Sequence, residues 1–165
     1  MIYFVTEAWL KKNTPITANV DVTDVTPWVQ VASDLEILPI LGTHFYNIIL
    51  SAYNAQTLTN DQILLVEKIK PAIAWKAAEL SVYGLTYQLK NKGLQKQSGD
   101  NSEAVDIEET KFGMSHYEQM SRFYSNQLIK WLKANKNLFP DFTSSLNNDS
   151  NYKDDVNTFD TIILI

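Results

Sequence analysis

One stretch near the middle of the chain, residues 58–93, constrains the fold more than any other feature. Thr59 followed by Gln62 has the spacing of a capping box, which marks the start of a helix. Gly93, preceded by lysines, has the composition of a helix C-terminus, where glycine and cations are favoured. Apolar residues recur between these ends at helical spacing. They are Leu65, Ile69, Ile73, Leu80 and Tyr87, with a second row of Ile63, Val66, Ala77 and Leu85. The sequence therefore predicts one helix roughly 50 Å long.

Pro71 lies inside this predicted helix. Proline lacks the backbone N–H that would bond to the preceding turn, and its ring crowds that turn. We therefore expect a kink near residues 67–70. A helix of this length is long for a domain of 165 residues, so we also expect some of its surface to contact a molecule outside its own subunit.

Shorter helices are predicted before the long one. Thr6 has the position of an N-cap for a helix over residues 7–13. After an extended connection over residues 14–25, Thr26-Pro27 has the pattern that begins a second helix. The predicted buried stripe of this second helix is Val29, Ala32, Leu35 or Glu36, and Leu38.

A corner follows in the segment LPILG, where Pro39 and Gly42 are expected to stop the second helix. A third helix then begins at Thr43. The side chains expected to face inward from it are Phe45, Ile48, Ile49 and Ala52.

A polar segment, residues 94–105, follows the long helix and has no helical periodicity. Loops of this length are uncommon unless they have a function. Asp106 and Glu109 then repeat the capping pattern and predict a last helix over residues 107–135. Its apolar set is Phe112, Met120, Phe123, Tyr124, Leu128, Ile129, Trp131 and Leu132.

The end of the chain divides into two parts. Residues 143–158 are polar and have too little apolar surface to fold alone. Residues 159–165 are β-branched and apolar, which predicts a strand; the large side chains are Phe159, Ile162, Ile163, Leu164 and Ile165. We therefore expect a helical domain over 1–142 and an extended acidic tail over 143–165. The predicted fold class is all-α: an elongated bundle with one long Pro-kinked central helix and a long loop before the last helix.

The net charge of −5 is concentrated in the tail. Residues 1–140 carry 14 acidic and 13 basic side chains, whereas residues 141–165 carry five acids and only Lys153. Neither part has the basic balance typical of a nucleic-acid binder. The chain has no cysteine and no apolar run near the ~20 residues that span a bilayer. We therefore expect no disulfide, no thiolate metal site and no membrane partner.

No pattern typical of an enzyme is present in the sequence. It contains neither a phosphate-binding glycine motif nor a nucleophile elbow. His44 and His116 have no carboxylate or histidine four residues away, which favours a surface role over metal binding. The segment from Asp149 begins like a calcium loop, but Lys153 stands where an oxygen ligand is required. We therefore expect no catalytic activity and no cofactor.

The order of three short segments resembles a known family. They are LPILG at the corner, IKPAIAW within the long helix, and NKGLQKQSGDNSEA before the last helix. Over about residues 2–142, their order and spacing resemble the head–tail connector proteins of tailed phages, and most of all those of crAss-like and related phages of Bacteroidetes. The resemblance implies a helical virion subunit, assembled in the host cytoplasm into a dodecameric ring at the head–tail interface. Such a ring extends the portal channel, contacts the portal and other connector or tail proteins, and meets DNA only as passing cargo.

A ring subunit contacts its neighbour through two different faces, which need complementary charge. The region around the long loop offers bases followed by acids, and we predict these as assembly residues: Lys90, Lys92, Lys96, Asp100 and Glu103. Four residues are predicted as structural corners: Pro39, Gly42, Pro71 and Gly93. Three alternatives remain open at this point: a monomeric bundle, a helical binding module that regulates an enzyme, and a small enzyme with an acidic site. The size of the native particle distinguishes a ring from all three.

The apolar end of the tail predicts a further contact. Burying its five large side chains would contribute on the order of 7–15 kcal/mol as an upper bound, before the ordering entropy is subtracted. We therefore expect residues 159–165 to add as a strand, or to insert as a plug, on an adjacent subunit or another connector protein.

Overall fold

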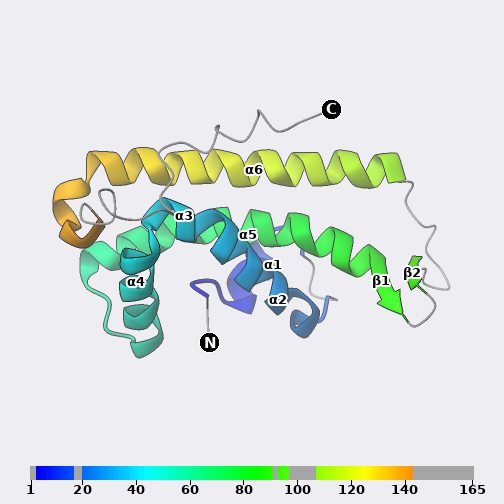
Figure 1. Cartoon of the computed structure of the whole chain (residues 1–165), viewed down its shortest axis with the longest axis horizontal. Helices are drawn as coiled ribbons and strands as arrows, with labels where there is room; N and C mark the ends of the chain where they lie inside the picture. The colour runs from blue at the N-terminus through cyan, green and yellow to red at the C-terminus, as the bar shows by residue number, and fades with distance from the viewer. Residues whose placement is uncertain (1–2, 17–19, 91–92, 97–106, 143–165) are drawn as a thin grey trace.

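The computed structural model describes residues 3–16, 20–90, 93–96 and 107–142, which form an elongated helical bundle (Figure 1). The predicted all-α fold is confirmed. The helices are α1 (Glu7–Asn13), α2 (Val22–Ala32), the π-helix η1 (Ser33–Ile37), α3 (Leu38–Leu41), α4 (Thr43–Ala55), α5 (Asn60–Thr86), α6 (Ile107–Ala134) and the 3-10 turn η2 (Lys136–Leu138). A small antiparallel hairpin, β1 (Tyr87–Lys90) and β2 (Gly93–Lys96), follows α5. No helix in the described ranges is long and apolar enough to cross a membrane.

The long helix α5 forms the centre of the bundle. α6 runs alongside it, and α2 packs against it from another direction (Figure 1). The predicted capping box is confirmed, because the Thr59 N–H donates to Gln62 Oε1 at 3.0 Å and the Gln62 N–H donates to Thr59 Oγ1 at 3.3 Å. The buried side chains of α5 cover more than half of the helix circumference; they are Leu65, Val66, Ile69, Ala72, Ile73, Ala74, Ala77, Ala78 and Ser81.

The second helix begins earlier than predicted. Asp21, not Thr26, is the N-cap, and its carboxylate accepts a hydrogen bond from the Thr23 N–H at 2.9 Å. α2 therefore starts at Val22 and runs through Pro27. The prediction failed because both Asp21 and Thr26 are good capping residues, and the sequence pattern favoured the one followed by proline.

The corner after the second helix is made by one residue and not by two. Pro39 lies inside α3 and does not stop the helix, which continues without a break from η1 through Pro39 to Leu41; the π-helical turn directly before Pro39 already shifts the hydrogen-bond pattern that proline would interrupt. Gly42 ends the run and has a φ of 75°, a conformation that favours glycine. The predicted burial of Val29 and Ala32 is confirmed, whereas Leu35 is 50% exposed. Of the two residues proposed for that position, Glu36 is the one that faces its neighbours.

The C-terminal end of α5 differs from the prediction. The helix ends at Thr86, and Gly93 is the first residue of β2, so Gly93 is not a helix C-cap. Lys90 pairs with Gly93, and Tyr87 with Lys96, in the antiparallel register. Gly84 and Thr86 weaken the last turn of the helix, and the aromatic and alternating residues that follow favour strand. The kink at Pro71 stays a prediction; α5 continues through that residue.

The last helix α6 has nearly the predicted bounds but a narrower buried face. Leu128, Ile129 and Leu132 are buried, as predicted. Phe112 and Phe123, assigned to the same apolar set, are 80% and 53% exposed. Because α6 packs mainly on α5, only one side of it is covered and these two phenylalanines lie away from that side.

Aromatic side chains fill the rest of the core. Phe4, whose backbone has a φ of 56°, is fully buried between Tyr46 and Tyr53 of α4. Phe45 packs between Phe139 and Phe142, so the segment after α6 folds back onto α4. The inward positions predicted for α4 are confirmed at Phe45 and Ile49, which are buried; Ile48 and Ala52 are half-buried.

Candidate assembly surfaces

The predicted assembly residues fall partly on the hairpin. Lys90 is the last residue of β1 and Lys96 is the last residue of β2, so they lie at opposite ends of the pairing register. Lys92, Asp100 and Glu103 lie outside the described residues, as does the whole tail, including Phe159, Ile162, Ile163, Leu164 and Ile165. The predicted switch from bases to acids along the loop therefore stays a prediction.

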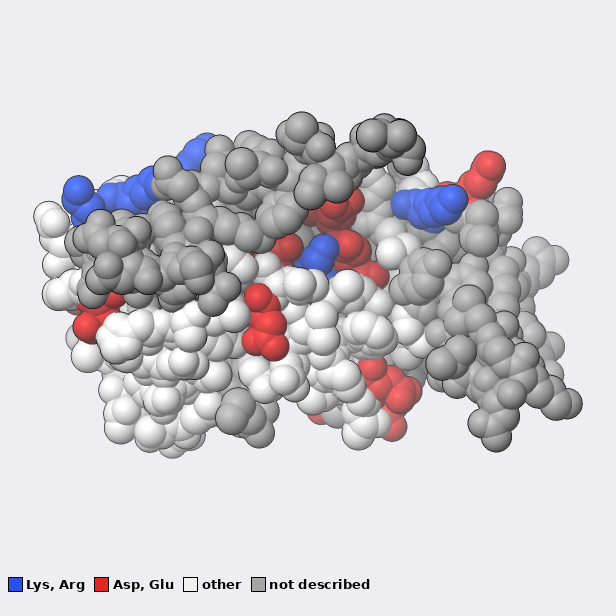
Figure 2. All heavy atoms as spheres, in the orientation of Figure 1, with Lys and Arg blue, Asp and Glu red and all other residues white. Residues whose placement is uncertain are grey.

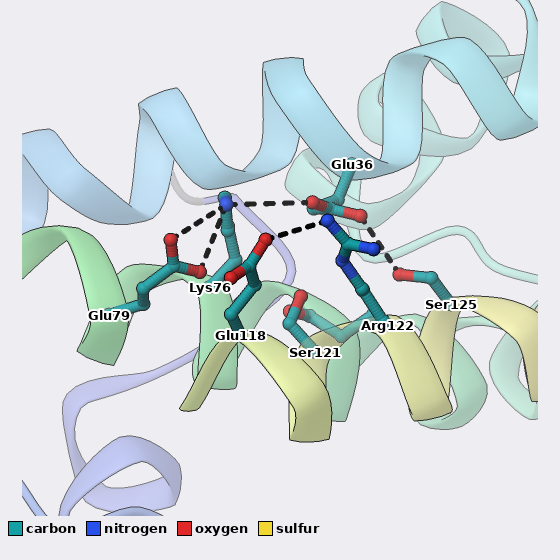
Figure 3. A network of polar contacts seen from close by, with 8 residues as sticks. Glu36, Lys76, Glu79, Glu118, Ser121, Arg122 and Ser125 are labelled. Carbon is teal, nitrogen blue, oxygen red and sulfur yellow. Dashed lines mark hydrogen bonds and ion pairs between the residues drawn. The ribbon is translucent and has the colours of Figure 1, made fainter. Parts of the chain in front are cut away.

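A polar network joins η1, α5 and α6 near the middle of the bundle (Figure 3). The Lys76 ammonium on α5 lies 2.9 Å from a carboxylate oxygen of Glu79 and 4.0 Å from one of Glu36. The other oxygen of Glu36 accepts a hydrogen bond from Ser125 Oγ of α6 at 3.0 Å. These three charged side chains are only 12–15% exposed. The network therefore ties the three elements together at a place the solvent scarcely reaches.

α6 adds further polar contacts to this region. Ser121 is buried and donates to the backbone carbonyl of Ala72 on α5 at 3.3 Å. Arg122 pairs with Glu118 one turn before it at 2.8 Å, with both side chains about 40% exposed. Three carboxylates, those of Glu36, Glu79 and Glu118, thus lie near two cations.

Electrostatics within the network favour the neutral form of one acid. Burial raises the pKa of Glu79 above its ordinary value, and the nearby carboxylates of Glu118 and Glu36 act in the same direction. The hydrogen bond and charge of Lys76 oppose this rise in the pKa. Elsewhere, burial raises the pKa of Tyr46 to about 12, and its hydroxyl lies 2.9 Å from Ser33 Oγ. In the part of the chain that the structure describes, no three His, Asp or Glu side chains are arranged so that they could hold one metal ion.

Gly84 allows α2 and α5 to approach closely. A Cβ atom at this position would lie 2.1–2.8 Å from three atoms of the Trp28 indole, far inside van der Waals contact. The other glycine in a long helix, Gly113 of α6, would place its Cβ in open space. Gly84 is therefore a packing residue, and sequence reasoning did not single it out.

Large apolar side chains are exposed in pairs on three helical surfaces. Val31 and Leu35 lie one turn apart on α2 and η1, at 39% and 50% exposure. Ile63 and Leu64 lie in the first turn of α5, at 46% and 55%. Phe112 and Phe123 lie on α6. Ile63 and Leu64 are adjacent in the sequence and therefore do not share one face of the helix. Single exposed apolar residues are normal, whereas contiguous exposed apolar patches are typical of contact surfaces.

Charge is divided between the helices in a way that the sequence analysis did not detect. No Lys or Arg occurs between residues 13 and 67, a segment that carries six acids. Three exposed lysines lie near the C-terminal end of α6 instead: Lys130, Lys133 and Lys136. Figure 2 shows Lys and Arg side chains along the upper left edge of the molecule, where the C-terminal end of α6 lies in Figure 1, and acids among uncharged residues on the lower face, where α2–α4 lie. The surface is therefore basic near the C-terminal end of α6 and acidic over α2–α4.

Comparison with known proteins places the chain in a family. The family model matches residues 37–152, more than half of the chain. The chain belongs to DUF6712, a family of unknown function. No curated protein and no solved structure matches it. The matched range begins at the end of η1 and covers the corner at Gly42, all of α4–α6 and the first part of the tail.

Two buried residues of the polar network, Ser121 and Ser125, were not predicted from the sequence, although their spacing carries a signal. Ser121, Ser125, Leu128 and Leu132 follow the alternating three- and four-residue spacing of a buried helical face. Because Ser121 and Ser125 are polar, the predicted apolar set includes Leu128 and Leu132 of this row but not the two serines. A small polar residue in line with buried leucines is a usable signal for a buried hydrogen bond.

Proposed function

We propose that this protein is a structural virion subunit that forms an oligomeric ring in a phage head-to-tail connector. In this role it docks on the portal and extends the DNA channel towards the tail. The observation that carries the proposal is the exposed apolar surface on a long outer helix. α6 spans roughly 42 Å at 1.5 Å per residue, and it leaves Phe112 at 80% and Phe123 at 53% exposure. A subunit that is covered by neighbours in its assembled form accounts for such a face.

Two further observations support a ring over a protein that acts alone. The basic end of α6 and the acid-bearing α2–α4 face give one subunit two different surfaces, as a head-to-tail contact requires. The order of the LPILG, IKPAIAW and NKGLQKQSGDNSEA segments resembles that of phage connector proteins. The copy number we propose is twelve by that resemblance, and we propose no catalytic role.

The proposal is tested by the size and shape of the particle. The purified full chain, alone and mixed with the portal protein from the same genome, should elute far above 18.8 kDa and form rings in negative-stain electron micrographs. A chain that remains monomeric with and without the portal contradicts the proposal and favours a helical binding module. A pull-down that finds a host enzyme and no virion protein would favour that same alternative.

Removal of residues 159–165 tests whether the tail takes part in assembly. The truncated chain should keep the melting temperature and helical content of the full chain while its assembly weakens, because we propose that the apolar end docks on another subunit. Loss of helical structure in the truncated monomer would show that the tail belongs to its own core. Reversal of Lys92 and Lys96 to Glu should also weaken assembly, more at low salt than at high salt.

A further inference from the structure

A face of α2 and a face of α6 carry matching patterns of charge and apolar surface. On α2, Asp24 and Val31 are seven residues apart and both are exposed. On α6, Phe123 and Lys130 are also seven residues apart and exposed. Seven residues are close to two helical turns, so each pair lies on one side of its helix with its members about 10 Å apart. The two faces therefore have the same spacing and opposite charge.

The patterns fit each other when the two helices are antiparallel. Val31 opposite Phe123 then places Asp24 opposite Lys130. Leu35, one turn beyond Val31 and 50% exposed, then lies opposite Gln119, at the end of the apolar contact. In this arrangement the N-terminal part of α2 lies beside the C-terminal part of α6, where their helix dipoles attract.

The exposed charges nearest each face in the sequence have the same sign as the face itself. Asp34 is exposed beside Leu35, and Lys76, the base that the structure places near Glu36 of η1, is only 15% exposed. On α6, no acid occurs between residues 119 and 135. Electrostatic complementarity of this kind selects and orients partners.

We propose that the α2–η1 face of one copy packs antiparallel on the α6 face of the next copy. This inference rests on the proposed function and names the repeated contact of the ring. The contact is heterologous because its two sides differ, so an open chain of copies keeps one unoccupied face of each kind, at its two ends, until the ring closes. Val31 and Phe123 are both exposed within one chain, so a second copy is what brings such residues together.

Cross-linking of two single-cysteine chains tests the contact directly, because the chain has no cysteine of its own. One full-length chain carries Val31→Cys and the other, with a different tag, carries Phe123→Cys. A short bis-maleimide reagent should join them into mixed dimers, at a yield several-fold above that of dimers of either variant alone. Val31→Cys mixed with Ile63→Cys is the matched control, since Ile63 is also an exposed apolar residue on another helix.

Three results would overturn the inference. Equal or greater yield from Phe123→Cys alone would indicate a symmetric contact of α6 with α6. Equal yield from the Ile63→Cys control would assign the partner surface to the first turn of α5. No cross-link in an assembled particle would leave both faces to another occupant, such as the tail or the portal.

Charge reversal gives an independent test. Asp24→Lys or Lys130→Glu alone should raise the concentration needed for half-assembly by about three- to tenfold, since each places like charges opposite one another. An equal mixture of the two variants should assemble almost as well as the unmodified chain, because each contact then joins opposite charges. Failure of the mixture to recover would contradict the proposed pairing.

Matched substitutions separate this effect from local changes. Asp61→Lys also reverses a first-turn acid, on α5, and Lys12→Glu also reverses an exposed lysine near a helix end, on α1. Both should leave the half-assembly concentration within about twofold of the unmodified value. A shift in these controls as large as that of Asp24→Lys would assign the effect to net charge and overturn the inference.

The outcomes distinguish the contact from the function. If rings form with the portal but Val31 and Phe123 do not cross-link, the connector proposal is supported and the proposed contact is contradicted. If the chains cross-link but form no ring and do not bind the portal, the contact is supported and the connector proposal is contradicted.

Discussion

The two long helices, α5 and α6, have 27 and 28 residues but opposite relations to solvent. α5 is covered from several directions, and its buried residues are almost all aliphatic or alanine. α6 is covered along one side, and that side includes the buried hydroxyls of Ser121 and Ser125. The comparison shows that helix length by itself does not decide burial. The more apolar helix, α5, is the one with neighbours on several sides.

The same contrast extends to the small residues. α5 uses alanines at positions such as Ala72, Ala74 and Ala77, where neighbouring helices come close. Its glycine, Gly84, touches an indole, whereas the glycine of α6, Gly113, faces open space. Small residues thus mark close helix approach in α5 and carry no such meaning at Gly113.

The largest expected effect is the loss of stability caused by a substitution in the buried core of α5. Ile73→Ala removes most of a fully buried side chain from the centre of α5 and should lower the free energy of unfolding by about 2–5 kcal/mol. Phe112→Ala on the outer side of α6 removes a larger side chain but should change the free energy of unfolding by at most about 0.5 kcal/mol. Urea denaturation of dilute protein measures both values. Comparable losses would show that α6 is not an edge helix in the isolated chain.

The two glycines give the next test. Gly84→Ala forces the Trp28 indole to move and should destabilise the chain by about 1–3 kcal/mol. Gly113→Ala meets no neighbour and should stabilise it by about 0.5–1 kcal/mol, because alanine is the better helix former. Melting temperatures of the two variants should therefore move in opposite directions. A shift of Gly84→Ala in the same direction as Gly113→Ala would mean that Trp28 adjusts without cost.

The smallest expected effect is a pH dependence of stability caused by Glu79 in the polar network between α5 and α6. Since burial raises the pKa of Glu79 in the folded chain, the folded state binds its proton more tightly than the unfolded state does. The stability that this protonated acid contributes is present below its ordinary pKa of 4.5 and is lost as the pH rises through the folded value. The unmodified chain should therefore lose stability relative to Glu79→Gln as the pH rises above 4.5, which urea denaturation at successive pH values measures.

A matched substitution makes that test specific. Glu67→Gln changes a carboxylate on the exposed side of the same helix, whose side chain is 54% exposed. A pH dependence of the same size for Glu67→Gln would assign the effect to the general charge of the protein and not to the buried network.

The sequence by itself determined the helical character of the chain and most of its helix positions. Thr59 and Gln62 marked the start of α5, and the row of Leu65, Ile69 and Ile73 marked its core side. Gly42 marked the corner between α3 and α4. These features are local: a capping box, a helical repeat and a positive φ are each set by residues within a few positions of one another.

Only the tertiary structure decided which apolar residues are covered and at which residue α5 ends. Phe123 and Leu128 both belong to an apolar pattern, but α5 lies against one of them and not the other. Gly93 has the residue type of a helix end, yet the chain leaves the helix at Thr86 and pairs as a hairpin instead. The Glu36–Ser125 contact joins residues 89 positions apart. Local periodicity carries no information about such distant partners, and for that reason the surfaces that we propose for assembly became visible only in the folded chain.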